Sequence, residues 1–185
     1  METSPAENKI PIGISSCLLG EEVRFDSGHK NNPYITGTLG NYFEFKSICP
    51  EVYIGLGIPR EPIRLIEKNS KIECVGSKTA SLNVTTKLTA CADRQKYWHN
   101  RIYGYILKKD SPSCGMERVK VYKNNHPQRT GKGLYAQQLM KNYPNLPLEE
   151  EGRLGDPVLR ENFIKRVFIY ERWRQLREKN LSIAT

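Results

Sequence analysis

The stretch KIPIGIS, residues 9 to 15, is a short apolar segment of the kind that forms a buried β-strand. Three later runs are similarly β-prone: FEFKSI at 43 to 48, YGYILKK at 103 to 109 and VKVYK at 119 to 123. Between them, a helix is expected at CADRQKYWHNRIY (91 to 103) and a shorter one at TLGNYF (38 to 43). Strands that alternate with helices predict an α/β fold, with a mostly parallel sheet flanked by helices in a Rossmann-like, three-layer arrangement.

Two more helices are expected after residue 130. The first, GKGLYAQQLMKNY, begins after the glycines at 131 and 133 and is followed by a proline-rich connector, PNLPLEEEG. The second runs from Pro157 to Lys179, with Asp156 as a favourable N-cap and a proline at the first helical position. Its apolar residues recur every three or four positions: Leu159, Phe163, Val167, Tyr170 and Trp173. Because its other residues include many Lys and Arg, we predict a basic amphipathic C-terminal helix.

The length and composition are those of a soluble globular protein. A chain of 185 residues can bury a core without disulfides, and no apolar run approaches the roughly 20 residues that a membrane span needs. We interpret residues 1–8 as a disordered leader, 9–150 as one domain and 151–185 as a C-terminal helical extension. Because residues 1–8 lack the features of a signal peptide, we expect a cytoplasmic protein with no membrane attachment.

The net charge of +9 favours anionic partners, which include nucleic acids, nucleotides and membrane surfaces. A solvated basic face that only keeps the protein soluble explains the same charge. The sequence shows no obligate protein partner.

Three of the five cysteines follow predicted strands. Cys17 comes after the first strand, Cys49 after the second and Cys114 a few residues after the third, whereas Cys74 and Cys91 lack this pattern and are interpreted as buried thiols. Carboxyl ends of parallel strands meet at one edge of a sheet, so these three distant cysteines are expected to converge. An odd number of cysteines in a reducing compartment argues against a disulfide framework. Metal binding and plain burial both remain open.

The choice of metal depends on the ligands available. A structural zinc usually has four protein ligands, and a catalytic zinc usually has histidine among them. His29, in the loop RFDSGHK, is the one promising histidine, and with the neighbouring Lys30 it serves equally well as an anion-binding group. A 4Fe-4S cluster held by three cysteines, with its fourth iron open to substrate, fits soft thiolate ligands better.

Three sequence blocks carry a family resemblance. GISSCLLGEEVRFDSGHK, SICPEVYIGLGIPREPIRL and KKDSPSCGMERVKVY each contain one of the three cysteines, and together they resemble the signature of the thiouracil desulfurase (TudS) family. Residues 133 to 168 resemble the longer relatives in which this domain is fused to a YbgA-like helical domain and which act on tRNA thiouridine. One departure is Ser27, where a second glycine is expected before Gly28.

The resemblance implies roles for individual residues. Cys17, Cys49 and Cys114 match the three ligands of the family's 4Fe-4S cluster, which makes 9–150 an iron-sulfur desulfidase domain. Glu51 and Ser111 match the catalytic carboxylate and hydroxyl. In that family the open iron takes up the sulfur of a thiocarbonyl, and the reaction is a hydrolysis without net electron transfer. Without the resemblance, Glu51 reads as an acid in the first turn of a helix and Ser111 as a turn hydroxyl.

The substrate is the finer question. Basic residues flank the cysteine blocks and are candidates for binding substrate or phosphate: His29, Lys30, Arg60, Arg64, Lys108 and Lys109. Since the resemblance is to the fused relatives, we favour a hydrolytic desulfuration of 4-thiouridine in tRNA, with release of hydrogen sulfide. Free thiouracil or a thiouridine nucleotide is the alternative. A third hypothesis is a non-catalytic RNA-binding module with a structural metal.

Overall fold

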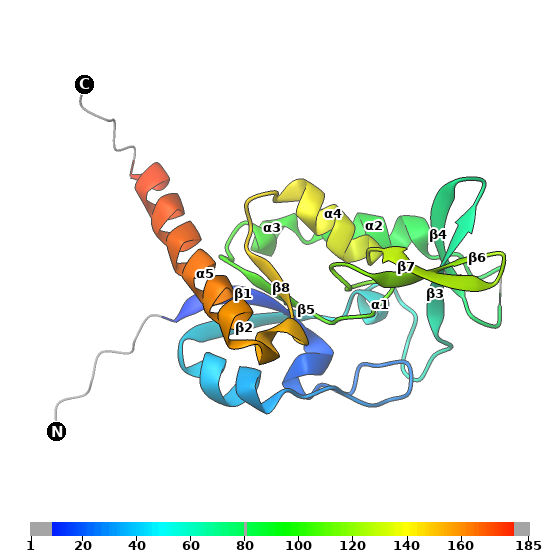
Figure 1. Ribbon diagram of the computed structural model, residues 1–185, viewed down its shortest axis with the longest axis horizontal. Helices are drawn as coiled ribbons and strands as arrows, with labels where there is room; N and C mark the ends of the chain where they lie inside the picture. The colour runs from blue at the N-terminus through cyan, green and yellow to red at the C-terminus, as the bar shows by residue number, and fades with distance from the viewer. Residues whose placement is uncertain (1–8, 80, 180–185) are drawn as a thin grey trace.

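The computed structural model of the protein describes residues 9–79 and 81–179, so the predicted leader, 1–8, lies outside the described residues. Sheet A is four-stranded, has the order β2-β1-β5-β8 and is parallel throughout (Figure 1). Its strands are β1 (Ile10–Ser15), β2 (Phe43–Ile48), β5 (Tyr105–Leu107) and β8 (Leu148–Glu150). The first three of the predicted strands therefore belong to one parallel sheet.

A second sheet lies beside the first. Sheet B has the order β4-β3-β6-β7, and only its central pair, β3 with β6, is parallel. Its strands are β3 (Ile63–Lys68), β4 (Lys71–Gly76), β6 (Val119–Lys123) and β7 (His126–Gly131). The run at 119–123 is thus a strand, as predicted, but it belongs to this second sheet. The sequence reading missed the other three strands of sheet B.

Helices α2 (Thr85–Arg94), α3 (Lys96–His99) and α4 (Leu134–Asn142) cover one face of sheet A. The helix predicted at 91–103 was wrong in its bounds. It begins at Thr85, just after a local turn in which Asn83 Oδ1 accepts hydrogen bonds from Thr85 N (3.1 Å) and Thr85 Oγ1 (2.7 Å). After α3 the chain enters β5 instead of continuing as a helix.

The other face of sheet A packs against α5 (Pro157–Glu178) and several short helical turns. The turns are Ser16–Leu19, Tyr34–Thr38, Leu39–Asn41 and Arg153–Gly155. Asp156 caps α5, as predicted, by accepting from Val158 N (2.8 Å) and Leu159 N (3.1 Å). Phe163 and Val167 are fully buried with the β1 isoleucines. The helix keeps contact with the body as far as Arg174, which donates to Ile102 O at 3.1 Å, and its end projects beyond (Figure 1). Trp173, at the end of the apolar stripe, is 39% exposed.

The segment PNLPLEEEG, predicted as a connector, contains β8, the edge strand of sheet A. Two of its glutamates hold neighbouring loops. Glu150 Oε1 accepts from Met116 N at 2.7 Å, and Glu151 Oε2 accepts from Lys109 N at 2.7 Å. Within the described residues, none of the helices is both long and apolar enough to span a bilayer.

Candidate functional site

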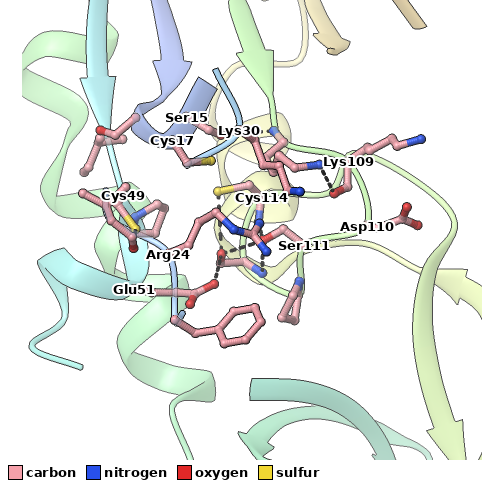
Figure 2. A pocket seen from close by; sticks show the side chains of 18 of the residues that line it. Ser15, Cys17, Arg24, Lys30, Cys49, Glu51, Lys109, Asp110, Ser111 and Cys114 are labelled. Carbon is pink, nitrogen blue, oxygen red and sulfur yellow. Dashed lines mark hydrogen bonds between the residues drawn. The ribbon is translucent and has the colours of Figure 1, made fainter. Parts of the chain in front are cut away.

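A pocket of about 320 Å³ opens at the carboxyl edge of sheet A. Six segments line it, namely residues 15–17, 23–25, Lys30, 48–51, Arg60 and 108–114. Three of them directly follow β1, β2 and β5, so the parallel sheet brings together stretches of chain that are far apart in sequence. Figure 2 shows side chains from these segments arranged around the pocket.

Cys17, Cys49 and Cys114 all line this pocket, whereas Cys74 and Cys91 do not. Cys17 is 8% exposed and Cys114 is 4% exposed. Burial raises the pKa of the Cys17 thiol to about 11, and burial likewise raises the pKa of the Cys49 and Cys114 thiols. A nucleophilic cysteine needs a lowered thiol pKa, so these three sites favour protonated thiols or thiolates held by a metal.

Glu51 is held in the pocket by an ion pair. It lies in the short helix α1 (Pro50–Tyr53), two residues after Cys49. The Arg60 guanidinium donates to Glu51 Oε2 from Nε at 3.0 Å and from Nη2 at 2.8 Å. The Arg60 side chain is only 5% exposed, and Glu51 only 14%. Since each guanidinium nitrogen of Arg60 donates to a protein atom, the phosphate-binding prediction for Arg60 gains no support from its position.

Ser111 lies in a tight turn that also carries Cys114. Its Oγ accepts from Cys114 N at 3.1 Å and lies 2.9 Å from Ser113 Oγ. This turn sits on the start of α4, where Leu134 N donates to Pro112 O at 3.0 Å and Ala136 N to Ser113 O at 3.1 Å. Gly133 permits the contact, since a Cβ there would lie 2.5 Å from the backbone of Ser113.

The mouth of the pocket is cationic. Lys108 Nζ pairs with Glu151 Oε1 at 2.5 Å, and both side chains are largely buried. Lys30 and Lys109 are exposed, and neither forms an ion pair within the part of the chain that the structure describes (Figure 2). These two lysines are the pocket-lining cations best placed to meet an anionic substrate.

The structure does not bring His29 or Arg64 into the pocket lining. His29 is exposed, and its Nδ1 accepts from Asn31 N at 3.1 Å. Arg64 lies on β3, with its guanidinium 5.1 Å from the centre of the Tyr122 ring. The phosphate-binding prediction for these two residues gains nothing from their positions.

A sequence profile described as 2-thiouracil desulfurase matches residues 12–151. The chain belongs to this family. Among its relatives is the uncharacterized protein YbbK of Bacillus subtilis (strain 168), which is 31% identical over 133 residues, covering 68% of this chain and 86% of YbbK. The solved structure of a [4Fe-4S]-dependent thiouracil desulfidase, TudS, is similar with a TM-score of 0.61 and 27% identity, covering 83% of this chain and 99% of that one. The predicted family and α/β fold are therefore confirmed.

The donor set of this desulfurase family member fits an iron-sulfur cluster. Three soft thiols reach one pocket, and the nearby Lys108 and Arg24 partly offset the burial that raises the pKa of the Cys17 thiol. Within 9–79 and 81–179, no group of three or more His, Cys, Asp or Glu is arranged to hold a single metal ion. A cluster makes a different demand, because each cysteine binds its own iron and the sulfurs need not meet at one point.

The sequence did not reveal two relationships in this site. Arg60 is the ion-pair partner of Glu51, and the Ser113 hydroxyl lies between Ser111 and Glu51. Ser113 Oγ donates to Glu51 Oε1 at 2.8 Å and is 1% exposed as a residue. Ser113 stands within the quoted motif SPSC, so the motif itself offered a second hydroxyl. No local signal relates Arg60 to Glu51, since the pairing depends on how residues 54–60 fold back.

Proposed function

We propose that this protein is a 4Fe-4S-dependent, non-redox desulfidase that converts the C=S group of a thiolated pyrimidine to C=O and releases hydrogen sulfide. We favour 4-thiouridine in tRNA as its substrate. One observation carries the proposal: a single pocket contains two buried thiols and a partly buried one, beside a carboxylate and a serine hydroxyl that are joined through Ser113 by hydrogen bonds.

Cys17, Cys49 and Cys114 are the proposed ligands of the cluster. When bound, the cluster would supply one Lewis-acidic iron that has no protein ligand and has affinity for sulfur. The pocket volume of about 320 Å³ lies at the small end of the range of ligand sites, as suits a pyrimidine base. A partly buried pocket also limits competing solvent around the reacting carbon.

Glu51 is the proposed general base. Its carboxylate takes a proton from the water that attacks the ring carbon bearing sulfur. Ser111 donates a hydrogen bond to the pyrimidine as negative charge develops on the ring. The water oxygen becomes the new carbonyl oxygen, and the sulfur departs as sulfide with the protons that water supplied. No electron is gained or lost by the pyrimidine.

The cationic mouth supports an RNA substrate over the free base. A nucleotide in tRNA brings phosphates on both sides of its sugar, and exposed Lys30 and Lys109 are positioned at the opening to meet them. The net charge of +9 acts in the same direction. Free thiouracil or a thiouridine nucleotide is the second candidate, and the structural similarity to a thiouracil desulfidase favours it.

The test is an anaerobic reconstitution with iron and sulfide, followed by turnover of 4-thiouridine in tRNA, 4-thiouridine monophosphate and 4-thiouracil. We expect about four irons per chain and loss of the thiocarbonyl absorbance with formation of hydrogen sulfide. Ser111→Ala should keep the iron and lose turnover by about 10²-fold or more. A protein that holds its metal and binds RNA, yet leaves all three substrates unchanged, is the non-catalytic module.

A further inference from the structure

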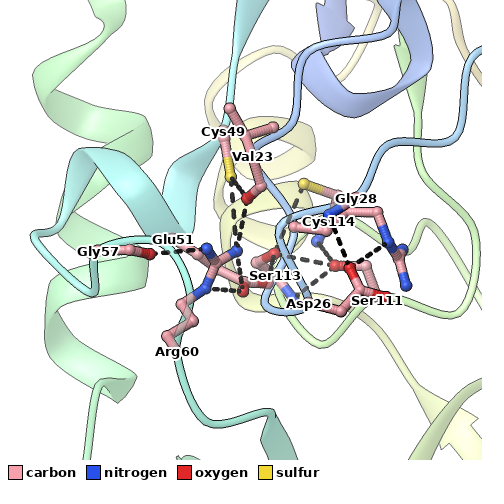
Figure 3. A network of polar contacts seen from close by, with 11 residues as sticks. Val23, Asp26, Gly28, Cys49, Glu51, Gly57, Arg60, Ser111, Ser113 and Cys114 are labelled. Atoms are coloured by element: carbon pink, nitrogen blue, oxygen red, sulfur yellow. Dashed lines mark hydrogen bonds and ion pairs between the residues drawn. The ribbon is translucent and has the colours of Figure 1, made fainter.

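Arg60 reaches Glu51 from the side of the pocket opposite the 111–114 turn (Figure 3). Two of its nitrogens donate to the same carboxylate oxygen, Oε2, at 3.0 and 2.8 Å. Its Nη1 donates to Gly57 O at 2.9 Å, and Nη2 also donates to Val23 O at 2.9 Å and lies 3.9 Å from Cys49 Sγ. Each guanidinium nitrogen of Arg60 therefore donates to at least one protein atom, and Oε1 of Glu51 remains available for other partners.

Ser113 holds that second oxygen. Its hydroxyl donates to Glu51 Oε1 at 2.8 Å and lies 2.9 Å from Ser111 Oγ. A hydroxyl has one proton, so a Ser113 that donates to Glu51 must accept from Ser111. Ser111 Oγ in turn accepts from Ser113 N at 3.3 Å and Cys114 N at 3.1 Å. In the site without substrate the order of donation is therefore Ser111 to Ser113 to Glu51. When Ser111 turns its proton to the pyrimidine, Ser113 keeps its hydrogen bond to Glu51.

We propose that Arg60 and Ser113 are positioning residues that hold Glu51 and Ser111 as one hydrogen-bonded unit with a defined geometry. The proposal rests on the proposed function, because Glu51 and Ser111 are its catalytic groups. Arg60 donates twice to Oε2 and Ser113 donates once to Oε1, so Oε1 keeps a lone pair for the attacking water. Fixing these side chains before substrate arrives removes the cost of ordering them during the reaction.

The first experiment is a variant cycle on the reconstituted enzyme with free 4-thiouracil, a substrate without phosphate. Arg60→Ala and Ser113→Ala should each lower kcat by about 10²-fold and change KM and the iron content little. In a Glu51→Gln background, adding Arg60→Ala should cause no further loss, because Arg60 acts through Glu51. Arg129→Ala is the matched control, since Arg129 pairs with the pocket carboxylate of Asp110 at 2.8 Å and does not contact Glu51.

The second experiment is chemical rescue. Arg60 lines the pocket, so Arg60→Ala leaves space that opens toward solvent. Added guanidinium ion should restore part of kcat in Arg60→Ala, while urea, which is similar in shape and uncharged, should not. Equilibrium dialysis of 4-thiouracil and the melting temperature are measured as well, because neither depends on turnover. We expect Arg60→Ala to bind 4-thiouracil within about three-fold of the parent, because the Arg60 contacts are to protein atoms.

Three results would overturn the inference. The first is an equal loss of kcat from Arg60→Ala in the parent and in Glu51→Gln. The second is a raised KM for the thiouridine nucleotide with normal turnover of 4-thiouracil, which would make Arg60 a phosphate ligand. The third is full activity of Ser113→Ala, which stays decisive if Arg60→Ala fails to fold. A parent enzyme that desulfurates none of the substrates instead refutes the proposed function.

Discussion

Ser113 Oγ donates a 2.8 Å hydrogen bond to Glu51 Oε1 across a separation of 62 residues in sequence. Ser113 immediately precedes Cys114, and Glu51 follows Cys49 by two residues. The bond therefore ties two cysteine-bearing loops together at the point where the proposed acid-base groups lie. A shift of either loop is expected to disturb both the metal ligands and the carboxylate.

Replacing any one of Cys17, Cys49 and Cys114 with Ser should strongly lower the iron bound after anaerobic reconstitution, from about four per chain in the parent. Each places one thiol in the pocket lining, where we propose that it binds the cluster. The matched controls are Cys74→Ala and Cys91→Ala, because these thiols are 0% and 1% exposed and lie outside the pocket lining. Iron and acid-labile sulfide are measured per chain. Loss of iron from the controls, with retention in the Cys114 variant, would contradict the ligand assignment.

Gly133→Ala should damage the site without touching a proposed functional residue. The new Cβ would lie 2.5 Å from Ser113 C and 2.7 Å from Cys114 N, and backbone atoms cannot move aside as a flexible side chain does. We expect a stability loss of about 1–3 kcal/mol and a marked fall in turnover. Gly155→Ala is the control, because nothing lies within 4 Å of its Cβ position. Chemical denaturation and kcat check the pair, and equal behaviour of the two variants would refute the steric argument.

His99 should make the stability depend on pH in the acid range. It is 1% exposed, its Nε2 lies 2.8 Å from Tyr135 Oη, and burial lowers its pKa to about 4. The folded protein holds His99 neutral, whereas the unfolded chain takes up a proton near pH 6.5, so stability is lost as the pH falls from about 6.5 to 4. The free energy of unfolding should fall by about 3 kcal/mol over this range.

The check is urea denaturation at several pH values of the parent and of His99→Gln, which removes the titrating group. The variant should be less stable at neutral pH and should show a flatter decline below pH 6.5. His126→Gln, on the exposed strand β7, is the control and should keep the slope of the parent. An unchanged slope in His99→Gln would show that other groups cause the acid dependence.

Replacing Lys30 and Lys109 together with Gln should weaken turnover of thiolated tRNA and leave turnover of free 4-thiouracil nearly unchanged. Only the RNA offers phosphates to the pocket mouth. If each lysine neutralises one phosphate, the slope of log(kcat/KM) against log[salt] for tRNA should become shallower by about 1–2. Lys68→Gln with Lys71→Gln, exposed residues on sheet B, is the control pair. Equal losses on both substrates would count against RNA as the substrate.

Much of the fold could be predicted from local pattern. The bounds of β2 and β6, the start of α4 after Gly133 and the capped start of α5 follow from β-prone runs, glycines and an Asp-Pro pair acting over a few residues. The strands β3, β4 and β7 were missed, since charged residues such as Lys68, Lys71 and Arg129 interrupt their apolar pattern on the exposed face. The edge strand β8 was taken for a connector because it is short and rich in glutamate.

By itself, the sequence determined the family, the parallel order of the strands that precede the cysteines and the identity of the candidate ligands and catalytic groups. These follow from short stretches of sequence, because β-propensity and the ligand chemistry of cysteine are properties of the residues themselves. Only the tertiary structure decided that Arg60 forms an ion pair with Glu51 and that Ser113 joins Glu51 to Ser111. It also decided that Lys108 pairs with Glu151, which leaves Lys30 and Lys109 as the exposed cations at the pocket mouth. An ion pair or a bridging hydroxyl depends on where side chains from distant segments meet, and that placement is set by packing across the sheet edge.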